Sequence, residues 1–492
     1  MPRSNSPTRP LALTSALALS ALVLAGCAAG PDYVEPDLAA PDAWTSAVEL
    51  EMSSATPDLE AWWTALGDTA LVSLIAQADT SNLGAAAALA RLEEARAAAG
   101  IARGAYWPRV DGRGGYTRAK LSEQSSPGNV TGGGPDDLWE AGFDATWEID
   151  VFGRNRRLNE AAVASWEASV EGYRDALVTL YAEVASNYVL VRTLQARLEY
   201  ATANVKALES TAQLTQDRYD AGLTSLLDVT RAQSNLAGTR ASIPSLEADL
   251  QAALNRLAVL LGQTPGSLHA RLAAATPLPQ APDSLLVGLP ADLLRRRPDV
   301  RRAERQLAAQ TARIGVASAD LYPTFSISGF LGLESTDFGD LTGEGSTTWG
   351  LIPGFRWNLF NGGATRSRIE VEEARSRQSL AAYEETVLRA LEDVENAMVG
   401  LDRARQRRDE LALAAEATAS SVELVHTQYI SGLTDFQNYL DAQRSLVSQQ
   451  DQLAVSEGAV IQQLIALNKA LGGGWSPDRV PARLLVAEED DR

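Results

Sequence analysis

The stretch RYDAGLT, residues 218–224, returns as QYISGLT at residues 428–434. Gly222 and Gly432 lie 210 positions apart, and the same offset relates Ala232 to Ala442, Gln233 to Gln443, Leu236 to Leu446, Gly262 to Gly472, and Trp147 to Trp357. Self-similarity at a fixed period is the signature of a duplicated structural unit. The two halves of the chain, each about 210 residues long, are therefore expected to share one fold.

A long stretch with helical periodicity precedes each of these glycines. No proline interrupts residues 154–219, and the apolar residues from Val170 to Leu208 recur every three or four positions, as do those from Leu380 to Leu401. This period is typical of amphipathic helices of coiled-coil character. At 1.5 Å per residue each helix would be about 100 Å long, which predicts a long cylinder rather than a compact domain.

A second helix is expected after each glycine, over residues 226–261 and 436–471, because glycine supplies the left-handed residue that ends a helix. Each half then contains an αα-hairpin with its tip at Gly222 or Gly432. Pro244 is expected to kink the first returning helix. Further alanine-rich helices are predicted over residues 71–105 and 299–319, ahead of the remaining segments of each half.

Those remaining segments alternate apolar and polar residues with a period of two. Residues 108–118, 141–150, 322–333 and 347–359 make four candidate strands of membrane-spanning length, joined in hairpins by loops at 119–135 and 334–346. Four strands cannot close a barrel, and lipid does not tolerate open edges, so a spanning chain must oligomerise. Two copies would give eight strands and a filled bore, three would give twelve and a lumen, and four remain compatible with the sequence.

The first 26 residues have the character of a secretory signal, since two arginines precede an uncharged run at residues 11–25. That run is too short for a stable transmembrane helix, which needs about 20 apolar residues, so cleavage is expected. Leu24-Ala25-Gly26 before Cys27 resembles the bacterial lipobox, in which the cysteine receives lipid; the alternative is an ordinary signal with a chance cysteine. Ala28, rather than an aspartate, follows and by resemblance to sorting rules favours the outer membrane.

Charge and composition argue against two classes of function. The formal net charge of −20 does not suit nucleic-acid binding, which needs a basic surface. An enzyme is not expected, because His269 and His426 are the only histidines and the single cysteine is assigned to lipid. No metal and no cofactor are predicted.

Several motifs resemble those of TolC-like outer membrane factors, in particular the NodT-type outer membrane efflux lipoproteins. They are Gly30-Pro31-Asp32-Tyr33, Trp62-Trp63 with Leu66-Gly67-Asp68, WEIDVFGR at residues 147–154, and LPADLLRRRPDV at residues 289–300. The resemblance runs from about Cys27 to Trp475. It implies a mixed α and β membrane protein, in which four strands per chain contribute to a trimeric twelve-stranded outer-membrane β-barrel, continued by a long α-helical barrel in the periplasm.

The resemblance also implies a function and partners. The homotrimer would be the outer-membrane channel of a tripartite efflux system, a passive duct for small molecules. An inner-membrane pump, of the proton-driven RND type, would deliver them through a periplasmic membrane-fusion adaptor. The chain would be lipid-anchored in the cell outer membrane and extend into the periplasm, in contact with outer-membrane lipid.

This architecture divides the chain into consecutive parts. They are the signal peptide (1–26), the lipidated N-terminal segment and equatorial region (27–66), a helix (67–105), the first β-hairpin (106–153), the first helical hairpin (154–262), an equatorial linker (263–297), a helix (298–320), the second β-hairpin (321–362), the second helical hairpin (363–472) and the C-terminal tail (473–492).

The hairpin tips are the candidate functional site, since a gate can act at the far end of a tunnel. In the family, an aspartate of the first tip bonds a tyrosine and an arginine of the second tip and holds the aperture closed. Asp228 and Tyr429 match the aspartate and the tyrosine, whereas Thr434 stands at the arginine position. The resemblance thus implies a gate with an altered latch.

Further aspartates ring the pore in the family. Asp441 matches one of them, Asn438 occupies the position of the other, and Asp435 lies near enough in sequence to substitute. An acidic ring would favour cations, because like charges brought together create a strong local field. The alternative is that these are solvated charges at helix ends.

The turns themselves resemble the family's adaptor-docking tips. They are Gly222-Leu223-Thr224-Ser225 and Gly432-Leu433-Thr434, with the two leucines as exposed apolar contacts. Capping the hairpin and docking the adaptor are compatible roles for one turn.

Two other groups of residues are interpreted structurally. Arg295, Arg296, Arg297 and Asp299 are predicted to form a junction, because Pro298 suits the first position of a helix and Asp299 its positive end. The residues Trp139, Trp147, Trp349 and Trp357 are expected either in interfacial aromatic belts or in core packing.

Two alternative functions fit the same sequence. A non-conducting periplasmic scaffold lipoprotein would use the long helices as a coiled coil and the strands as surface hairpins. An outer-membrane duct for protein or peptide secretion would keep the architecture and change the cargo.

Overall fold

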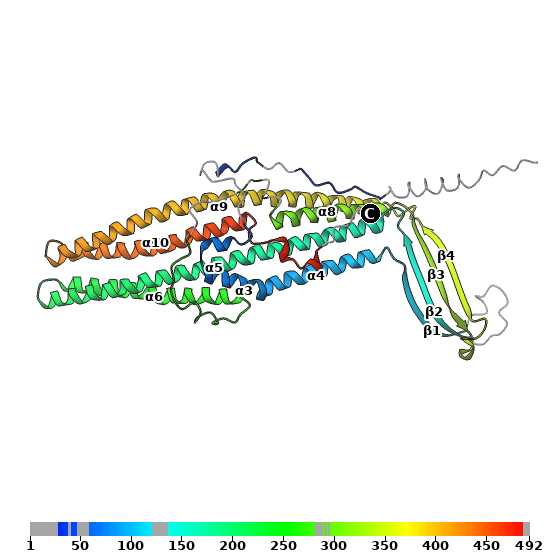
Figure 1. Ribbon diagram of the computed structural model, residues 1–492, viewed down its shortest axis with the longest axis horizontal. Coiled ribbons are helices and arrows are strands. Elements are labelled where there is room, and N and C mark those ends of the chain that lie inside the picture. Colours follow the sequence, from blue (N-terminus) through cyan, green and yellow to red (C-terminus); the bar gives the residue numbers. More distant parts are fainter. Residues whose placement is uncertain are drawn as a thin grey trace, which may run out of the picture.

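The computed structural model describes residues 28–37, 41–46, 59–120, 136–280 and 296–485, together with residues 288, 290 and 293. Within these residues the chain is an elongated body with a β-sheet at one end and two helical hairpin tips at the other (Figure 1). The predicted mixed α and β class and the internal duplication are confirmed.

The long helices are matched in pairs across the duplication. Helices α5 (Arg154–Asp220) and α9 (Ala364–Ile430) each have 67 residues, and α6 (Leu226–Leu260) and α10 (Phe436–Ala470) each have 35. At 1.5 Å per residue, α5 and α9 are about 100 Å long. Helix α6 continues through Pro244. Among the described helices, none combines the length and the apolar character needed to cross a bilayer.

Within the described residues, three shorter α-helices accompany these four: α3 (Thr69–Ser81), α4 (Leu83–Gly104) and α8 (Pro298–Ala319). The prediction of one helix over residues 71–105 is wrong, because Asn82 separates α3 from α4. Asn82 has extended backbone angles, its side chain accepts a hydrogen bond from the Ala85 amide, and its Nδ2 donates to the Leu260 carbonyl. A short polar residue that caps the second helix and holds a distant carbonyl interrupts the helical backbone.

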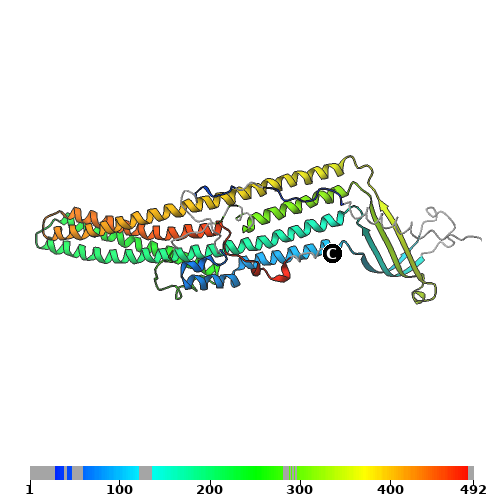
Figure 2. The ribbon, with the colours of Figure 1, turned by 45° about the horizontal axis from the view of Figure 1, so that its top comes forward.

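The helices are arranged differently on the two sides of the middle. Toward the sheet, α4, α5, α8 and α9 lie side by side in that order (Figure 2). Toward the tips, the order is α6, α5, α10 and α9, with α5 against α10. One chain therefore forms a curved wall of four helices at each level.

The main core lies in the middle, where short segments pack on α5. The 3₁₀ helix η1 (Trp62–Leu66) buries Trp63 against Tyr181 of α5, with ring centroids 5.0 Å apart. Asp68 caps α3 and also accepts a 2.5 Å hydrogen bond from the Tyr188 hydroxyl. Burial raises the pKa of Tyr188 to about 12, and the bond to Asp68 acts in the same direction. The Trp-Trp and Leu-Gly-Asp motifs thus anchor this segment to the long helix.

The part of the chain that the structure describes has three further 3₁₀ turns: η2 (Phe338–Asp340) in the second strand connection, and η3 (Pro477–Arg479) and η4 (Ala482–Leu484) near the C-terminus. Arg479 of η3 forms a 2.5 Å ion pair with Asp79 of α3. The indole of Trp166 on α5 donates to the Leu484 carbonyl at 3.2 Å. These contacts fix the C-terminal segment along α5.

Candidate functional site: the sheet and the hairpin tips

Four antiparallel strands form one sheet in the order β1 (Arg109–Ala119), β2 (Asp136–Ile149), β3 (Thr324–Ser335) and β4 (Thr347–Arg356). All four predicted strands are present, with β2 beginning five residues earlier than the predicted start at residue 141. Within the described residues, β1 pairs only with β2 and β4 pairs only with β3. Both outer edges therefore carry unpaired backbone groups, which lipid does not tolerate.

The two faces of the sheet differ in polarity. On one face, apolar residues lie opposite each other in successive strands: Val110 and Ala145, Phe143 and Leu331, Phe325 and Phe355. The opposite face carries Arg113 and Asp144, joined by a 3.5 Å ion pair, and Glu148. Trp349 on the apolar face is 73% exposed in the single chain. An apolar outer face and a polar inner face are typical of strands that line a membrane channel.

Aromatic side chains gather at both ends of the strands. Near the helices, the Trp147 indole donates to the Tyr106 carbonyl and the Trp357 indole donates to the Leu321 carbonyl, each at 3.0 Å. At the far end, Trp139 packs against Tyr116 and Phe338. The eight residue-to-residue steps from Trp139 to Trp147 span about 26 Å of strand, which matches the height of an outer-membrane apolar band. These positions therefore fit interfacial aromatic belts better than they fit packing in a protein core.

Residues 28–37, here called the N-terminal strap, are fixed where the strands meet the helices. The Ala29 amide donates to the Phe152 carbonyl at 2.9 Å, and Arg157 of α5 donates to the Ala29 carbonyl at 3.1 Å and to Asp32 at 2.6 Å. Gly30 approaches α8 so closely that a Cβ there would lie 2.4 Å from the Gly315 Cα. Cys27 and the predicted signal peptide lie outside the described residues.

The two tips have the same backbone geometry. Gly222 and Gly432 follow the ends of α5 and α9 with φ of 74° and 73°. In each tip the amide of the next leucine donates back to the helix, from Leu223 to the Arg218 carbonyl at 2.8 Å and from Leu433 to the Gln428 carbonyl at 2.9 Å. These bonds close the helix ends as glycine-terminated caps do. Leu223 is 66% exposed and Leu433 79%, so both project from the tips.

Asp228 closes the start of α6. Its carboxylate accepts hydrogen bonds from the Thr224 hydroxyl at 2.7 Å and the Ser225 hydroxyl at 2.9 Å, and it forms a capping box with Ser225. Partial burial alone would raise the pKa of Asp228, but the hydrogen bonds from Thr224 and Ser225 outweigh it and leave the pKa below its usual value. These hydrogen bonds of the Asp228 carboxylate thus lie within its own hairpin.

Tyr429 occupies a different environment. It is 4% exposed, packs with Phe436 and Tyr439, and its hydroxyl has no hydrogen-bond partner in the described chain. The Arg218 guanidinium of the first hairpin lies 4.8 Å from the Tyr429 ring centroid and donates to the Ile430 carbonyl at 3.3 Å. The expected bond between Asp228 and Tyr429 is therefore not formed within the chain, and an arginine from the first hairpin covers the tyrosine instead.

The other candidate gate residues belong to the start of α10. Asp435 is its N-cap residue without a side-chain cap bond, Asn438 donates to the Thr434 hydroxyl at 2.9 Å, and Asp441 accepts from Gln437 at 2.9 Å. The side chains of Asp435, Asn438 and Asp441 are exposed. The structure brings Thr434 and Asn438 together and leaves the two carboxylates at the surface of the tip.

Arg218 was missed as a site residue. Its signal lay in the repeat itself, because the duplicated position is Gln428, and a charged residue present in only one copy marks a place where the halves differ. Its contact with Tyr429 depends on the packing of α5 against α10, which the sequence period does not specify.

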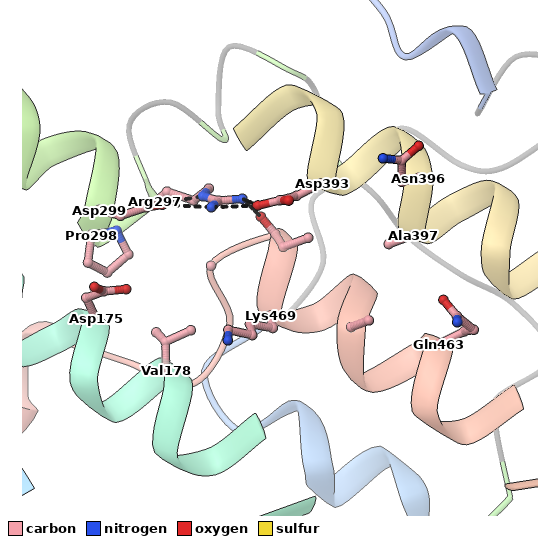
Figure 3. A pocket seen from close by; sticks show the side chains of 13 residues that line it. Asp175, Val178, Arg297, Pro298, Asp299, Asp393, Asn396, Ala397, Gln463 and Lys469 are labelled. Atoms are coloured by element: carbon pink, nitrogen blue, oxygen red, sulfur yellow. Dashed lines mark hydrogen bonds and ion pairs between the residues drawn. The ribbon is translucent and has the colours of Figure 1, made fainter. Parts of the chain in front are cut away.

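The predicted junction at the start of α8 is structural. Arg297 forms ion pairs with Asp299 at 2.7 Å and with Asp393 of α9 at 3.0 Å, and donates to the Ala470 carbonyl at the end of α10 at 3.1 Å. A cavity of about 360 Å³ lies between α5, α8, α9 and α10. Figure 3 shows Arg297 at its edge, pointing toward Asp393. Pro298 takes the first helical position, as predicted. Arg295 lies outside the described residues.

Comparison with known proteins gives a consistent result. The family model described as outer membrane efflux protein matches residues 74–263 and 289–473, once in each half of the duplication. A curated relative, nodulation protein T of Rhizobium leguminosarum bv. trifolii, is 32% identical over 93% of this chain and 96% of its own length. The solvent efflux pump outer membrane protein SrpC of Pseudomonas putida is 30% identical over 92% of this chain and 97% of its own.

A solved structure described as the outer-membrane channel OprN is similar in fold as well as in sequence. It superposes with a TM-score of 0.86, is 35% identical, and is matched over 91% of this chain and 100% of its own. A match over 91% of this chain extends over both of its duplicated halves.

Proposed function

Because the chain belongs to the outer membrane efflux protein family, we propose that three copies form the outer-membrane duct of a tripartite efflux system. The pair of open strand edges carries this proposal. Four strands per chain leave both edges unpaired, and three chains supply twelve strands, enough to enclose a lumen. The four-helix wall of each chain continues the tube into the periplasm for about 100 Å.

The duct is passive, and its cargo and driving force come from its partners. The relative SrpC is named for solvent efflux, and small apolar or amphiphilic molecules are the cargo class that we propose here. An inner-membrane pump of the proton-driven RND type would deliver them through a periplasmic membrane-fusion adaptor. Leu223 and Leu433 support an adaptor contact, because they are exposed apolar side chains on rigidly capped turns.

The tip residues would form the periplasmic gate. Three-fold repetition would bring Asp435 and Asp441 of three chains around the aperture, and their carboxylates would concentrate cations there. Asp228 and Tyr429 would keep the two hairpins in the shape that closes the aperture, each through contacts of its own. Thr434 would take the place of the family's latch arginine, and Asn438 that of one of the ring aspartates.

Lipid attachment at Cys27 fits the position of the N-terminal strap. Ala28 lies beside Gly153, where β2 passes into α5, so a lipid on the preceding residue would enter the membrane at the periplasmic end of the strands. The sheet and the lipid would then both anchor this part of the chain at the periplasmic face of the outer membrane.

Reconstitution of the purified full-length protein into planar bilayers tests the proposed function. A duct predicts a trimer that dissociates on heating and passes ions in discrete steps. A periplasmic scaffold predicts no conductance at any voltage, and that result would end the proposal. Increased accumulation of small fluorescent amphiphiles in cells that lack the gene, with unchanged secretion of proteins, would support small-molecule efflux over protein export.

A further inference from the structure

A groove of about 1150 Å³ lies beside the N-terminal strap, between α4, α5 and α8. Small or apolar side chains, among them Ala99, Trp166 and Ala308, form part of its lining. Five arginines and three acidic residues also line it, namely Arg96, Arg103, Arg157, Arg305 and Arg483 with Asp32, Glu160 and Glu167. Because the whole chain carries a formal net charge of −20, this local excess of positive charge runs against the overall charge of the protein.

Two of these arginines are unpaired in the part of the chain that the structure describes. Arg96 and Arg103 are exposed, and neither forms a hydrogen bond or an ion pair there. The other three have acidic partners: Arg157 pairs with Asp32 and Glu160, Arg305 with Glu167 and Glu304, and Arg483 with Glu93. Residues seven apart return to the same side of a helix, so Arg96 and Arg103 face the groove together, about 10 Å apart along α4. Two unpaired guanidinium groups favour an acidic occupant, because complementary charge aligns a ligand with its site.

The groove also offers room and a hydrogen-bond acceptor. Gly100 lies on α4 between the two unpaired arginines, and nothing lies within 4 Å of a Cβ at that position. The side-chain carbonyl oxygen of Asn159 is buried beside the groove and has no hydrogen-bond partner among the described residues. A buried polar atom of this kind calls for a donor. An acidic peptide supplies backbone N–H donors together with carboxylates, whereas an anionic phosphate group supplies acceptors alone.

The chain itself leads into this groove. Arg479 pairs with Asp79 of α3, and four residues later Arg483 pairs with Glu93 of α4. Leu485, the last residue that the structure describes, lines the groove. Because α4 runs toward the sheet, these contacts show that the chain advances along α4 in the direction of the two unpaired arginines.

The sequence that follows Leu485 has the charge and the length that the groove requires. Residues 486–492, here called the acidic segment, read VAEEDDR, with four consecutive carboxylates at 488–491. An extended chain advances about 3.3 Å per residue, so residue 488 can reach about 10 Å beyond Leu485. That reach equals the separation of Arg96 and Arg103 along α4, which places both arginines within range of the four carboxylates.

We propose that the acidic segment docks in this groove, with its carboxylates paired to Arg96 and Arg103. The docked segment connects α4, at the edge of the four-helix wall, to the side of α5 and α8 that carries the N-terminal strap. Its backbone N–H groups supply a donor to Asn159. This contact lies within one chain, so it depends neither on the proposed duct nor on the number of chains.

Disulfide formation tests the docking in the full-length protein, extracted from the outer membrane in mild detergent. Gly100→Cys places a thiol in the groove, and Ala487→Cys places one beside the carboxylates without removing any of them. The matched control combines Ala98→Cys with the same Ala487→Cys, because Ala98 is exposed and lies about 160° away around α4. Oxidation is followed over time, and mass spectrometry of tryptic peptides identifies the linked residues and sets aside any link to Cys27.

The proposal predicts that residues 100 and 487 link readily and that residues 98 and 487 do not. Arg96→Glu together with Arg103→Glu should slow the first link about tenfold at low ionic strength, and high salt should slow it as well. Glu488→Arg together with Asp490→Arg should restore the link in that background, since the charges of both partners are then exchanged. Thermal melting followed by circular dichroism checks that each variant remains folded.

Equal linking at residues 98 and 100 would overturn the proposal, because the acidic segment would then meet the surface of α4 without docking. A link that is insensitive to the charges at residues 96 and 103 would overturn it as well. If those arginine variants lose bound phosphatidylglycerol in native mass spectra while the link is unchanged, the groove belongs to a lipid and the proposal fails.

Discussion

The two ends of the molecule are held by different kinds of contact. At the sheet end, backbone hydrogen bonds join each strand to its neighbour from β1 through β4. The two open edges would form the same kind of bonds with the next chain. At the tip end, helices satisfy their own backbones and meet only through side chains. Backbone N–H and C=O groups in lipid have no water to bond if a strand separates, whereas side chains in water can exchange a partner for solvent. The sheet end is therefore the fixed end of the molecule, and we expect movement at the tips.

The strongest test of the fixed end is to disrupt strand pairing in the centre of the sheet. A Cβ at Gly142 would lie 2.7 Å from the Gly332 Cα on the paired strand, and backbone cannot move aside as a side chain can. Gly142→Val should cost more than about 3 kcal/mol, the upper end for overpacking, and abolish the heat-labile trimer on semi-native gels.

Gly354→Val is the matched control, since nothing lies within 4 Å of a Cβ at that position of β4. It should assemble normally. Equal trimer yields for the two variants would break the claim that tight strand pairing closes the sheet end.

The junction between the two ends should respond next most strongly. Arg297→Ala removes ion pairs to Asp299 and Asp393 and leaves the α10 carbonyl at Ala470 without its donor. Because Asp393 is half exposed, the free energy of unfolding should fall by about 2 to 3 kcal/mol, less than for a fully buried pair. Thermal melting followed by circular dichroism should show a lower midpoint.

Arg389→Ala offers a comparison at an exposed ion pair with Glu385 on α9. Surface pairs of this kind contribute about 0.5 kcal/mol or less, so its midpoint should stay close to that of the unmodified protein. A shift as large as that of Arg297→Ala would show that the junction has no special role.

At the tips, Tyr439→Phe removes the hydroxyl that bonds Thr211 and Gln443 between the two hairpins of one chain, which should cost about 1 kcal/mol of stability. Thermal melting followed by circular dichroism should show a slightly lower midpoint. An unchanged midpoint would show that this buried contact does not help to hold the two hairpins together.

The smallest expected effect is the pH dependence of the first tip. Hydrogen bonds hold the pKa of Asp228 below its usual value, so its capping contribution is present at neutral pH and is lost as the pH falls through that lowered pKa. Protease cleavage at residues 222–228 should therefore accelerate only at acid pH.

Asp228→Asn keeps an acceptor for the cap but cannot titrate. Its cleavage rate should lack the acid-induced rise that the unmodified tip shows. An identical pH profile for both proteins would assign the effect to another group.

The sequence predicted the architecture well because its strongest signals are local and duplicated. Helix period, the glycines at residues 222 and 432, and strict alternation in the strands each specify an element without knowledge of distant contacts. The break at Asn82 was missed because its cause is a hydrogen bond to Leu260, far away in sequence. The contact of Arg218 with Tyr429 and the docking of the N-terminal strap on Arg157 were missed for the same reason.

The sequence predicted where the candidate site lies better than it predicted the hydrogen bonds within that site. Both turns adopt the expected geometry and expose Leu223 and Leu433. The aspartate–tyrosine bond carried over from the family is not formed within this chain, since Asp228 is used by its own helix cap. A local capping box such as that of Ser225 and Asp228 needs no partner from the other hairpin.

Closure of the sheet into a duct depends on the number of chains in the complex. Native mass spectrometry of the full-length protein, extracted from the outer membrane in mild detergent, counts them without assumptions about the pore. Closure of the open-edged sheet into a twelve-stranded duct predicts three chains in one stable complex. A complex of two or of four chains, or a monomer under the same conditions, would contradict it.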